Sequence, residues 1–225
     1  MGERVAAITG GHGALGPAVV EAAQAAGWTV AVIDHASGHV VPEGVLEVGG
    51  VDLTDAAQAK AAIEAVVARF GRLDALLNIA GGFVWSPVEG AGEEWDRMHA
   101  LNVKTTLNAS RAALPHLKAS SEGRIVNVGA NGAIKAGHGM GAYAASKAGV
   151  HRLTEALAEE LKSTSVTVNA VLPSIIDTAA NRADMPDADP AKWVAPVDLA
   201  AVILFLASPE ARAVTGALIP VTGKI

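Results

Sequence analysis

The feature of this sequence that most restricts its fold is a regular alternation of short apolar runs with helical segments. Each run has the length of a buried strand, and most stop at or near Gly, Asn or Asp. The runs are residues 4–9, 28–34, 73–80, 124–128, 166–172 and 217–221. Buried strands joined by crossover helices form parallel sheets. We therefore expect a single α/β domain over residues 1–225, with a Rossmann-type, doubly wound, mostly parallel seven-stranded sheet and helices on both faces.

The helical segments between these runs have recognisable ends. Thr54 is expected to cap a helix that stops at Gly71. Pro115 is expected to bend or end the last turn of a long helix over 93–117. The stretch 35–50 contains interspersed Gly and Pro and is expected to be irregular. Further helices are expected over residues 142–161 and 197–207.

Composition excludes several classes of function. Hydrophobic residues make up 51% of the chain and aromatic residues only 4%, so the core must consist mainly of Ala, Val, Leu and Ile. The formal net charge of −6, without a dense Lys/Arg run, argues against a nucleic-acid partner. Cysteine is absent, which excludes disulfides and thiolate chemistry. His, Asp and Glu show no metal-ligand spacing, so no metal is expected.

The sequence also indicates where the protein is located. Met1–Arg4 leads directly into a strand-like run, without the pattern of a secretory leader. No apolar run approaches the roughly 18 residues of a membrane span. We therefore expect a cytoplasmic protein with no membrane partner.

The loop after the first run predicts a dinucleotide site. Its glycines allow the backbone to approach a pyrophosphate, and the following helix directs its first N–H groups at the negative charge. Asp34 ends the second run, where a carboxylate accepts hydrogen bonds from the ribose hydroxyls and repels a 2′-phosphate. We therefore expect NAD(H) to be preferred over NADP(H). Protonation of His12 or His35 would weaken this preference.

Tyr143 and Lys147 are the residues most suited to acid–base chemistry. They lie four residues apart on one face of the helix expected over 142–161. An ammonium beside a phenol lowers the pKa of the phenol, so the pair is predicted to be a proton donor. The alternative is a surface lysine beside a half-buried tyrosine.

These motifs together resemble the short-chain dehydrogenase/reductase family, over nearly the whole chain. Each motif is short, but all occur in order and each follows the expected strand. The matching residues are Thr9, Gly10 and Gly16 in the first loop, Asn78, Ala80 and Gly81 after the fourth strand, Asn102 in the next helix, then Tyr143 and Lys147, and finally Pro173 with Thr178 after the sixth strand.

The resemblance implies a role for each matched position. Tyr143, Lys147 and Asn102 would be catalytic, with Asn102 anchoring a water in the proton relay. Asn102 could instead only kink its helix, and Thr178 could only cap one. The implied cofactor-binding residues are Gly10, His12, Gly13, Leu15, Gly16, Asp34, Asp52, Leu53, Asn78, Ala80, Gly81, Tyr143, Lys147, Pro173, Ile176 and Thr178.

The main departure from the family is Ala130. The family generally places a serine thirteen residues before the tyrosine, where its hydroxyl bonds the substrate oxygen. Removing one donor to a developing oxyanion typically costs on the order of 2.7–4 kcal/mol. Three alternatives remain open: the substrate develops little oxyanion character, Asn131 replaces the hydroxyl, or catalysis is degenerate.

One branch of the family supports the first alternative. The chain resembles quinonoid dihydropteridine reductases, which keep the tyrosine and lysine but lack the serine. The shared strings include residues 10–16, 80–82, 129–130 and 139–140, and the segment from Leu172 to Trp193. Hydride addition to a conjugated C=N system delocalises the charge, so an oxyanion donor is less needed. In contrast, residues 204–217 resemble bacterial carbonyl reductases of the family.

The substrate pocket is expected to be aromatic and covered by a lid. Large rings near strand ends suit a flat substrate, although core packing is the alternative for each. The segment at about 175–195 is expected to form the lid, whereas His138 and His151 are interpreted as surface or structural residues. The pocket residues expected are Phe83, Trp85, Ala130, Met185 and Trp193.

The leading hypothesis is an NAD(H)-dependent oxidoreductase that reduces a pterin-like or other C=N substrate. A ketone or secondary-alcohol dehydrogenase is the first alternative, and an NAD(H)-binding protein without turnover is the second. The family commonly pairs two long helices, here 93–117 and 142–161, across a symmetric interface. A homodimer or homotetramer is therefore expected.

Overall fold

A computed structural model describes residues 4–90 and 92–225. Within these ranges one sheet contains seven strands in the order β3-β2-β1-β4-β5-β6-β7, and every neighbouring pair is parallel. The single-domain, doubly wound α/β fold expected from the sequence is confirmed. The expectation about the first three residues lies outside the described ranges. The strands are β1 (Val5–Thr9), β2 (Thr29–Ile33), β3 (Leu46–Val48), β4 (Ala75–Asn78), β5 (Arg124–Val128), β6 (Thr167–Pro173) and β7 (Leu218–Val221).

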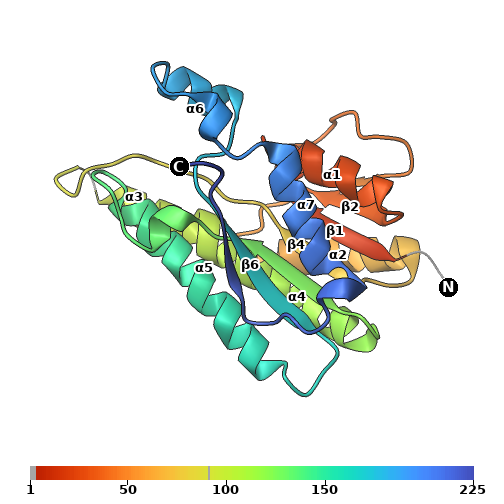
Figure 1. Cartoon of the computed structure of the whole chain (residues 1–225). Coiled ribbons are helices and arrows are strands. Elements are labelled where there is room, and N and C mark those ends of the chain that lie inside the picture. Colours follow the sequence, from red (N-terminus) through yellow and green to blue (C-terminus); the bar gives the residue numbers. More distant parts are fainter. Residues whose placement is uncertain (1–3, 91) are drawn as a thin grey trace.

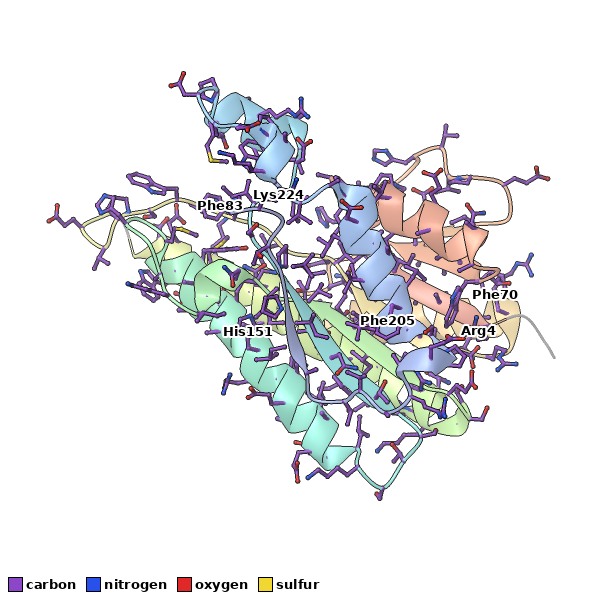
Figure 2. The ribbon with its side chains drawn as sticks, viewed as in Figure 1. Arg4, Phe70, Phe83, His151, Phe205 and Lys224 are labelled. Carbon is purple, nitrogen blue, oxygen red and sulfur yellow. The ribbon has the colours of Figure 1, made fainter. Side chains whose placement is uncertain are left out.

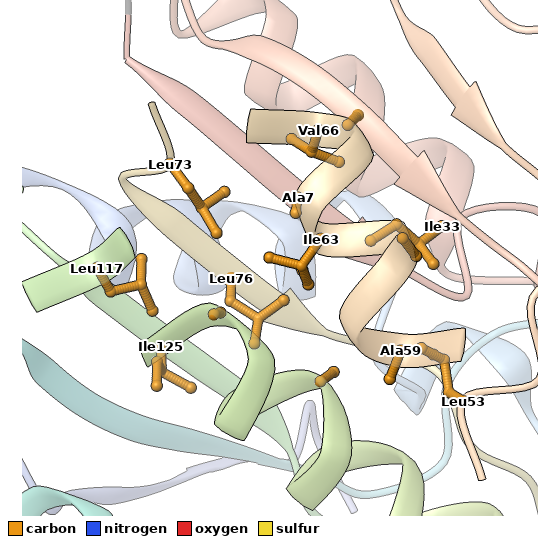
Figure 3. Packing of buried hydrophobic residues seen from close by; sticks show 14 of the residues in the cluster. Ala7, Ile33, Leu53, Ala59, Ile63, Val66, Leu73, Leu76, Leu117 and Ile125 are labelled. Atoms are coloured by element: carbon orange, nitrogen blue, oxygen red, sulfur yellow. The ribbon is translucent and has the colours of Figure 1, made fainter. Parts of the chain in front are cut away.

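Helices cover both faces of the sheet (Figure 1). Successive side chains of β1 point to opposite faces of the sheet, and both faces are apolar. Val5 and Ala7 join one apolar cluster, whereas Ala6 and Ile8 join the other. Figure 3 shows the cluster that contains Ala7, in which Ile63, from the helix over Ala56–Phe70, lies near residues of the strands. One face carries α1 (Gly16–Ala25) and α7 (Pro196–Ala207), and the other carries α2 (Ala56–Phe70), α4 (Thr105–Ala119) and α5 (Gly141–Glu160).

The connectivity places a crevice at the carboxyl ends of β1 and β4. The chain runs outward from β1 to β2 and β3, then returns to β4 on the other side. In such sheets ligands bind where the strand order reverses. The Thr9 hydroxyl ties the two strand ends together, because it accepts the N–H groups of Ile79 (3.1 Å) and Ala80 (3.2 Å).

Local structure departs from the sequence-based expectations at two places in the first half. The stretch 35–50 is not wholly irregular, because β3 forms within it and pairs with β2. The cap of α2 is Asp55 rather than Thr54. The Asp55 carboxylate accepts the N–H groups of Ala57 and Gln58, whereas Thr54 donates to Asp52.

The long helix expected over 93–117 is interrupted. It consists of α3 (Glu93–Met98), a π-helical segment over His99–Lys104 and then α4. Thr106 Oγ1 donates to the Asn102 carbonyl at 2.8 Å, a back-bond that competes with the regular helical ladder. Pro115 does not end α4, which continues to Ala119.

Candidate active site

A cavity of about 1430 Å³ opens at the carboxyl edge of the sheet. It is lined by segments that follow β1, β2, β4, β5 and β6. The structure therefore brings together most of the residues predicted to bind the cofactor or the substrate. The predicted cofactor residues at this cavity are Gly10, Gly13, Leu15, Asp34, Asp52, Leu53, Ala80, Gly81, Tyr143, Lys147, Pro173, Ile176 and Thr178. The predicted substrate-side residues at it are Phe83, Trp85, Ala130, Asn131 and Met185.

Five predicted residues do not line the cavity. Asn78 joins β4 to β5, since its Nδ2 donates to Asn127 Oδ1 at 2.9 Å. Trp193 is only 8% exposed, so the core-packing alternative describes it and the expected pocket position does not. The other three are His12, Gly16 and Asn102.

The first loop is held by backbone contacts and by carboxylates. A Cβ on Gly16 would lie 2.3 Å from the Gly11 carbonyl oxygen, so only glycine lets α1 start this close to the loop. The Asp34 carboxylate accepts the His12 N–H at 2.9 Å. The His12 ring lies 3.0 Å from Glu47 Oε1 and stacks on His39, which explains its absence from the cavity.

Tyr143 lies in the first turn of α5 and lines the cavity (Figure 2 labels the neighbouring Phe83). Its ring meets Phe83 edge-on, with centroids 4.9 Å apart. Burial raises the pKa of Tyr143 to about 12. The predicted lowering of this pKa is therefore wrong for the free protein, because the loss of solvent outweighs any help from a neighbouring cation.

Lys147 is buried and aimed at the end of β5. Its Nζ donates to the Val128 carbonyl at 2.8 Å, and only 5% of the residue is exposed. Burial lowers the pKa of the ammonium to about 8. The group remains mostly protonated at neutral pH, and N–H donors beyond the one bonded to Val128 are available towards the cavity.

Asn102 clamps the loop that follows β4. Its Oδ1 accepts the Gly82 N–H (3.0 Å), and its Nδ2 donates to the Gly82 carbonyl (3.1 Å) and to Ser146 Oγ (2.9 Å). The residue is fully buried in the π-helical segment. It therefore connects the loop after β4 to α5, the helix that carries Tyr143 and Lys147.

Two loops form an aromatic wall on the substrate side. Trp85 Nε1 donates to the His138 carbonyl at 3.0 Å, and the Ser86 N–H donates to the Gly139 carbonyl at 2.8 Å. Gly139 has φ +70°, and a Cβ there would meet the Trp85 ring. Phe83 and Trp85 nevertheless remain 52% and 54% exposed, so their rings present free surface.

The segment expected to be a lid projects from the body as α6 (Ala179–Asp184) (Figure 1). Thr178 caps this helix by accepting the Asn181 N–H at 3.1 Å, so its capping role is confirmed. A parallel bridge between Ile176 and Val194 closes the base of the segment. Met185 follows α6 and lines the cavity.

His151 is structural rather than at the surface, which is one of the two alternatives expected from the sequence, but its partner was not predicted. It is 4% exposed, not at the surface, and its Nε2 accepts the Ala130 N–H at 3.3 Å. The signal was present in the spacing, since His151 follows Lys147 by four residues on the same helix face.

The described ranges, residues 4–90 and 92–225, contain neither a membrane-spanning helix nor a metal-binding cluster. No helix there is long and apolar enough to cross a membrane. No group of three or more His, Asp and Glu side chains among residues 4–90 and 92–225 is arranged to hold a metal ion.

Comparison with known proteins places this geometry in context. A family profile described as short chain dehydrogenase matches residues 4–189. A 3-oxoacyl-[acyl-carrier-protein] reductase of Thermotoga maritima is 35% identical over 184 residues, which cover 78% of this chain and 75% of that protein. A 2-(S)-hydroxypropyl-CoM dehydrogenase of Xanthobacter autotrophicus is 33% identical over 97% of this chain and 95% of that protein.

A solved structure has the same fold. The 3-ketoacyl-(acyl-carrier-protein) reductase from Brucella melitensis, complexed with NADH, has a TM-score of 0.87 and 29% identity. The match covers 99% of this chain and 98% of that one.

The packing around Gly81 gives a stability prediction. A Cβ there would lie 2.5 Å from Asn102 Oδ1 and 3.2 Å from Lys147 Nζ, so Gly81→Ala overpacks the clamp. We expect a loss of about 1–3 kcal/mol, or roughly 2–4 °C in Tm per kcal/mol, by thermal denaturation. Gly92→Ala is the matched control, because a Cβ at Gly92 meets no atom within 4 Å. Equal melting temperatures of the two variants would contradict the described clamp.

Proposed function

This chain belongs to the short-chain dehydrogenase/reductase family, and we propose that it is an NAD(H)-dependent reductase of a flat, conjugated acceptor. A quinonoid dihydropterin or another cyclic C=N compound is the substrate class. The observation that carries the proposal is Ala130, a methyl-bearing residue at the cavity where the family generally has a serine hydroxyl. The relatives are dehydrogenases and reductases, which sets aside the alternative of a binder without turnover.

The residues present fit a nicotinamide dinucleotide. The cavity extends from Asp34 and Asp52 at one end to Tyr143 and Lys147 at the other, and glycines line the part between. Glycines permit close approach of a pyrophosphate, and the buried Lys147 ammonium offers N–H donors to ribose hydroxyls. When bound, the nicotinamide would supply the hydride.

Asp34 supports the preference for NAD(H). Its carboxylate lies at the cavity where the adenosine ribose would be held, with Glu47 also near the first loop. Two carboxylates near this position disfavour a 2′-phosphate through like-charge repulsion.

Tyr143 is the proposed proton donor. Because burial raises the pKa of Tyr143 to about 12, the phenol carries its proton at neutral pH. This state suits reduction, in which the reduced nitrogen takes a proton from the phenol as hydride adds to the conjugated system. Lys147 would act as a nearby cation that stabilises the phenolate formed in this step, and Asn102 would hold the loop and helix in register.

The aromatic side chains at the cavity wall favour a flat ring as substrate. Phe83 and Trp85 are about half exposed and border the same cavity as Tyr143. Aromatic rings provide large apolar faces on which a planar heterocycle stacks. The Asn131 side chain makes no hydrogen bond within the described part of the chain and lines this cavity, so its amide is free to bond an exocyclic oxygen.

A ketone or secondary alcohol is the second candidate substrate. The relatives support it, since they include a 3-oxoacyl-[acyl-carrier-protein] reductase and a 2-(S)-hydroxypropyl-CoM dehydrogenase. In this case the Asn131 amide would replace the missing serine hydroxyl as donor to the oxygen.

The expected homodimer or homotetramer and the cytoplasmic location remain proposals. Small residues on α5 would allow close approach of a second helix, but Ala142 and Ala144 are buried within the chain itself. Ala145 is exposed and available for contact with a second copy. Packing of α4 and α5 against their symmetry mates would therefore use the outer face of α5 only.

The first prediction concerns the proton donor. Tyr143→Phe removes the phenolic O–H and should lower NADH-dependent reduction by about 10²–10⁴-fold while NADH affinity stays near that of the parent. Turnover is measured with quinonoid dihydropterin, a cyclic imine and a ketone panel, and NADH binding by fluorescence. An unchanged rate would exclude Tyr143 as donor, and turnover of ketones alone would contradict the C=N substrate class.

The second prediction concerns the missing hydroxyl. Ala130→Ser should raise ketone reduction by up to about 10²–10³-fold and change C=N reduction little, because only the ketone develops a localised oxyanion. Ala133→Ser in the adjacent turn is the matched control. A correctly folded Ala130→Ser variant with no gain on ketones would show that oxygen stabilisation does not limit this site.

The third prediction concerns the cofactor. Asp34→Asn removes the charge but keeps one acceptor for the two N–H groups, of His12 and Ala36, that the carboxylate holds. Removal of repulsion worth about 1 kcal/mol or more should shift the ratio of kcat/KM for NADPH to that for NADH by roughly fivefold or more. Asp55→Asn is the control, because Asp55 caps α2. An unchanged ratio in Asp34→Asn would show that Asp34 does not cause the preference for NAD(H).

A further inference from the structure

One face of α5 carries three functional groups at equal spacing. Tyr143, Lys147 and His151 follow one another at intervals of four residues. Tyr143 lines the cavity, whereas Lys147 and His151 bond to the backbone at and just beyond the end of β5. Figure 2 marks His151 on this helix. The first two residues have roles in the proposed reaction, whereas the third is buried, polar and not yet assigned.

The contacts of His151 lie at the residue that departs from the family. Lys147 Nζ donates to the Val128 carbonyl at 2.8 Å, and two residues further along the Ala130 N–H donates to His151 Nε2 at 3.3 Å. Between them, a Cβ on Gly129 would lie 2.5 Å from His151 Nε2. The approach of the imidazole to the backbone therefore requires glycine at position 129.

The hydrogen bond defines the protonation state of the ring. An imidazole nitrogen that accepts an N–H carries no proton, so His151 is neutral with its proton on Nδ1. Burial, and then the charges of Arg152 and Lys147, lower the pKa of His151. Both the contact and the surroundings therefore favour the neutral ring.

We propose that His151 is a positioning residue, which holds the Ala130–Asn131 turn so that the Asn131 amide reaches the substrate. The inference rests on the proposed function, because it assumes that the cavity beside Tyr143 receives the substrate. The Ala130 N–H is committed to the imidazole and is not a free donor. Asn131, which starts the turn at 131–133, is left as the donor beside Tyr143.

Three substitutions separate positioning from simple filling of space. His151→Gln keeps an acceptor at nearly the reach of Nε2, His151→Asn keeps one that is too short, and His151→Leu keeps volume without an acceptor. His116→Leu on α4 is the matched control, because His116 contacts Glu64 and does not line the cavity.

The direct readout needs no substrate. In ¹⁵N-labelled protein with NADH bound, exchange of the Ala130 amide hydrogen should be about tenfold or more faster in His151→Asn and His151→Leu. His151→Gln and His116→Leu should keep exchange near the parent rate. Equal exchange in all variants would overturn the proposal, even if Tyr143→Phe proved that the proposed function is correct.

Kinetics supply the second readout, with whichever quinonoid dihydropterin, cyclic imine or ketone turns over fastest. His151→Leu and His151→Asn should lower kcat/KM about tenfold with NADH affinity retained, and His151→Gln should restore most of it. A uniform loss in all three variants would contradict the role of the acceptor. If no compound in the panel turns over, the proposed function fails while amide exchange still decides the role of His151.

The dependence of activity on pH tests whether His151 must be neutral. Protonation removes the acceptor, so parent activity should fall on the acid side, below the ordinary imidazole pKa of about 6.5. The lowered pKa of His151 also means that its contribution to stability is present above that value and is lost as the pH falls through the folded pKa. Charged groups near the ring are Lys147 and Arg152, which keep their charge in this range. If the activity of His151→Gln still fell on the acid side as it does in the parent, the role given to His151 would be contradicted.

Discussion

The site depends on how one face of α5 is docked against the end of β5. Three contacts set this docking: Asn127 Nδ2 donates to Thr154 Oγ1 (2.8 Å), Lys147 Nζ donates to the Val128 carbonyl, and the Ala130 N–H donates to His151. Buried polar groups are costly when unpaired, so these bonds allow little rotation or sliding of the helix. The position of the Tyr143 phenol follows from this arrangement.

The same helix also organises the neighbouring loops. The Ser146 hydroxyl donates to the Tyr143 carbonyl and accepts a hydrogen bond from Asn102 Nδ2, which also donates to the Gly82 carbonyl. The loop beyond Gly82 carries Phe83, whose ring meets Tyr143, and Trp85, which bonds the loop that leads into α5. Acid–base groups and aromatic wall are therefore parts of one connected network, with the helix at its centre.

The sequence predicted the sheet, its helices and most of the cavity because these follow from local patterns. Strands ending in Gly, Asn or Asp direct polar groups to one sheet edge whatever the details of packing. The unpredicted features depend on distant partners. The π-helical segment reflects back-bonding by Thr106 and the clamp between Asn102 and Gly82, and β3 is a short edge strand that exists by pairing with β2. Trp193 could not be assigned to pocket or core by spacing, and the raised pKa of Tyr143 follows from loss of solvent around the phenol, which spacing does not show.

The central claim is that a half-buried, protonated phenol supplies the proton, and Tyr143 is the only tyrosine in the chain. Its ionisation can therefore be followed directly by tyrosinate absorbance during a pH titration, with circular dichroism to show that the fold is intact. The account predicts no ionisation of the folded protein near the ordinary pKa of 10, and a midpoint near 12 or tyrosinate only on unfolding. A midpoint near or below pH 7 in the folded protein would contradict it, because the phenol would then not hold its proton at neutral pH.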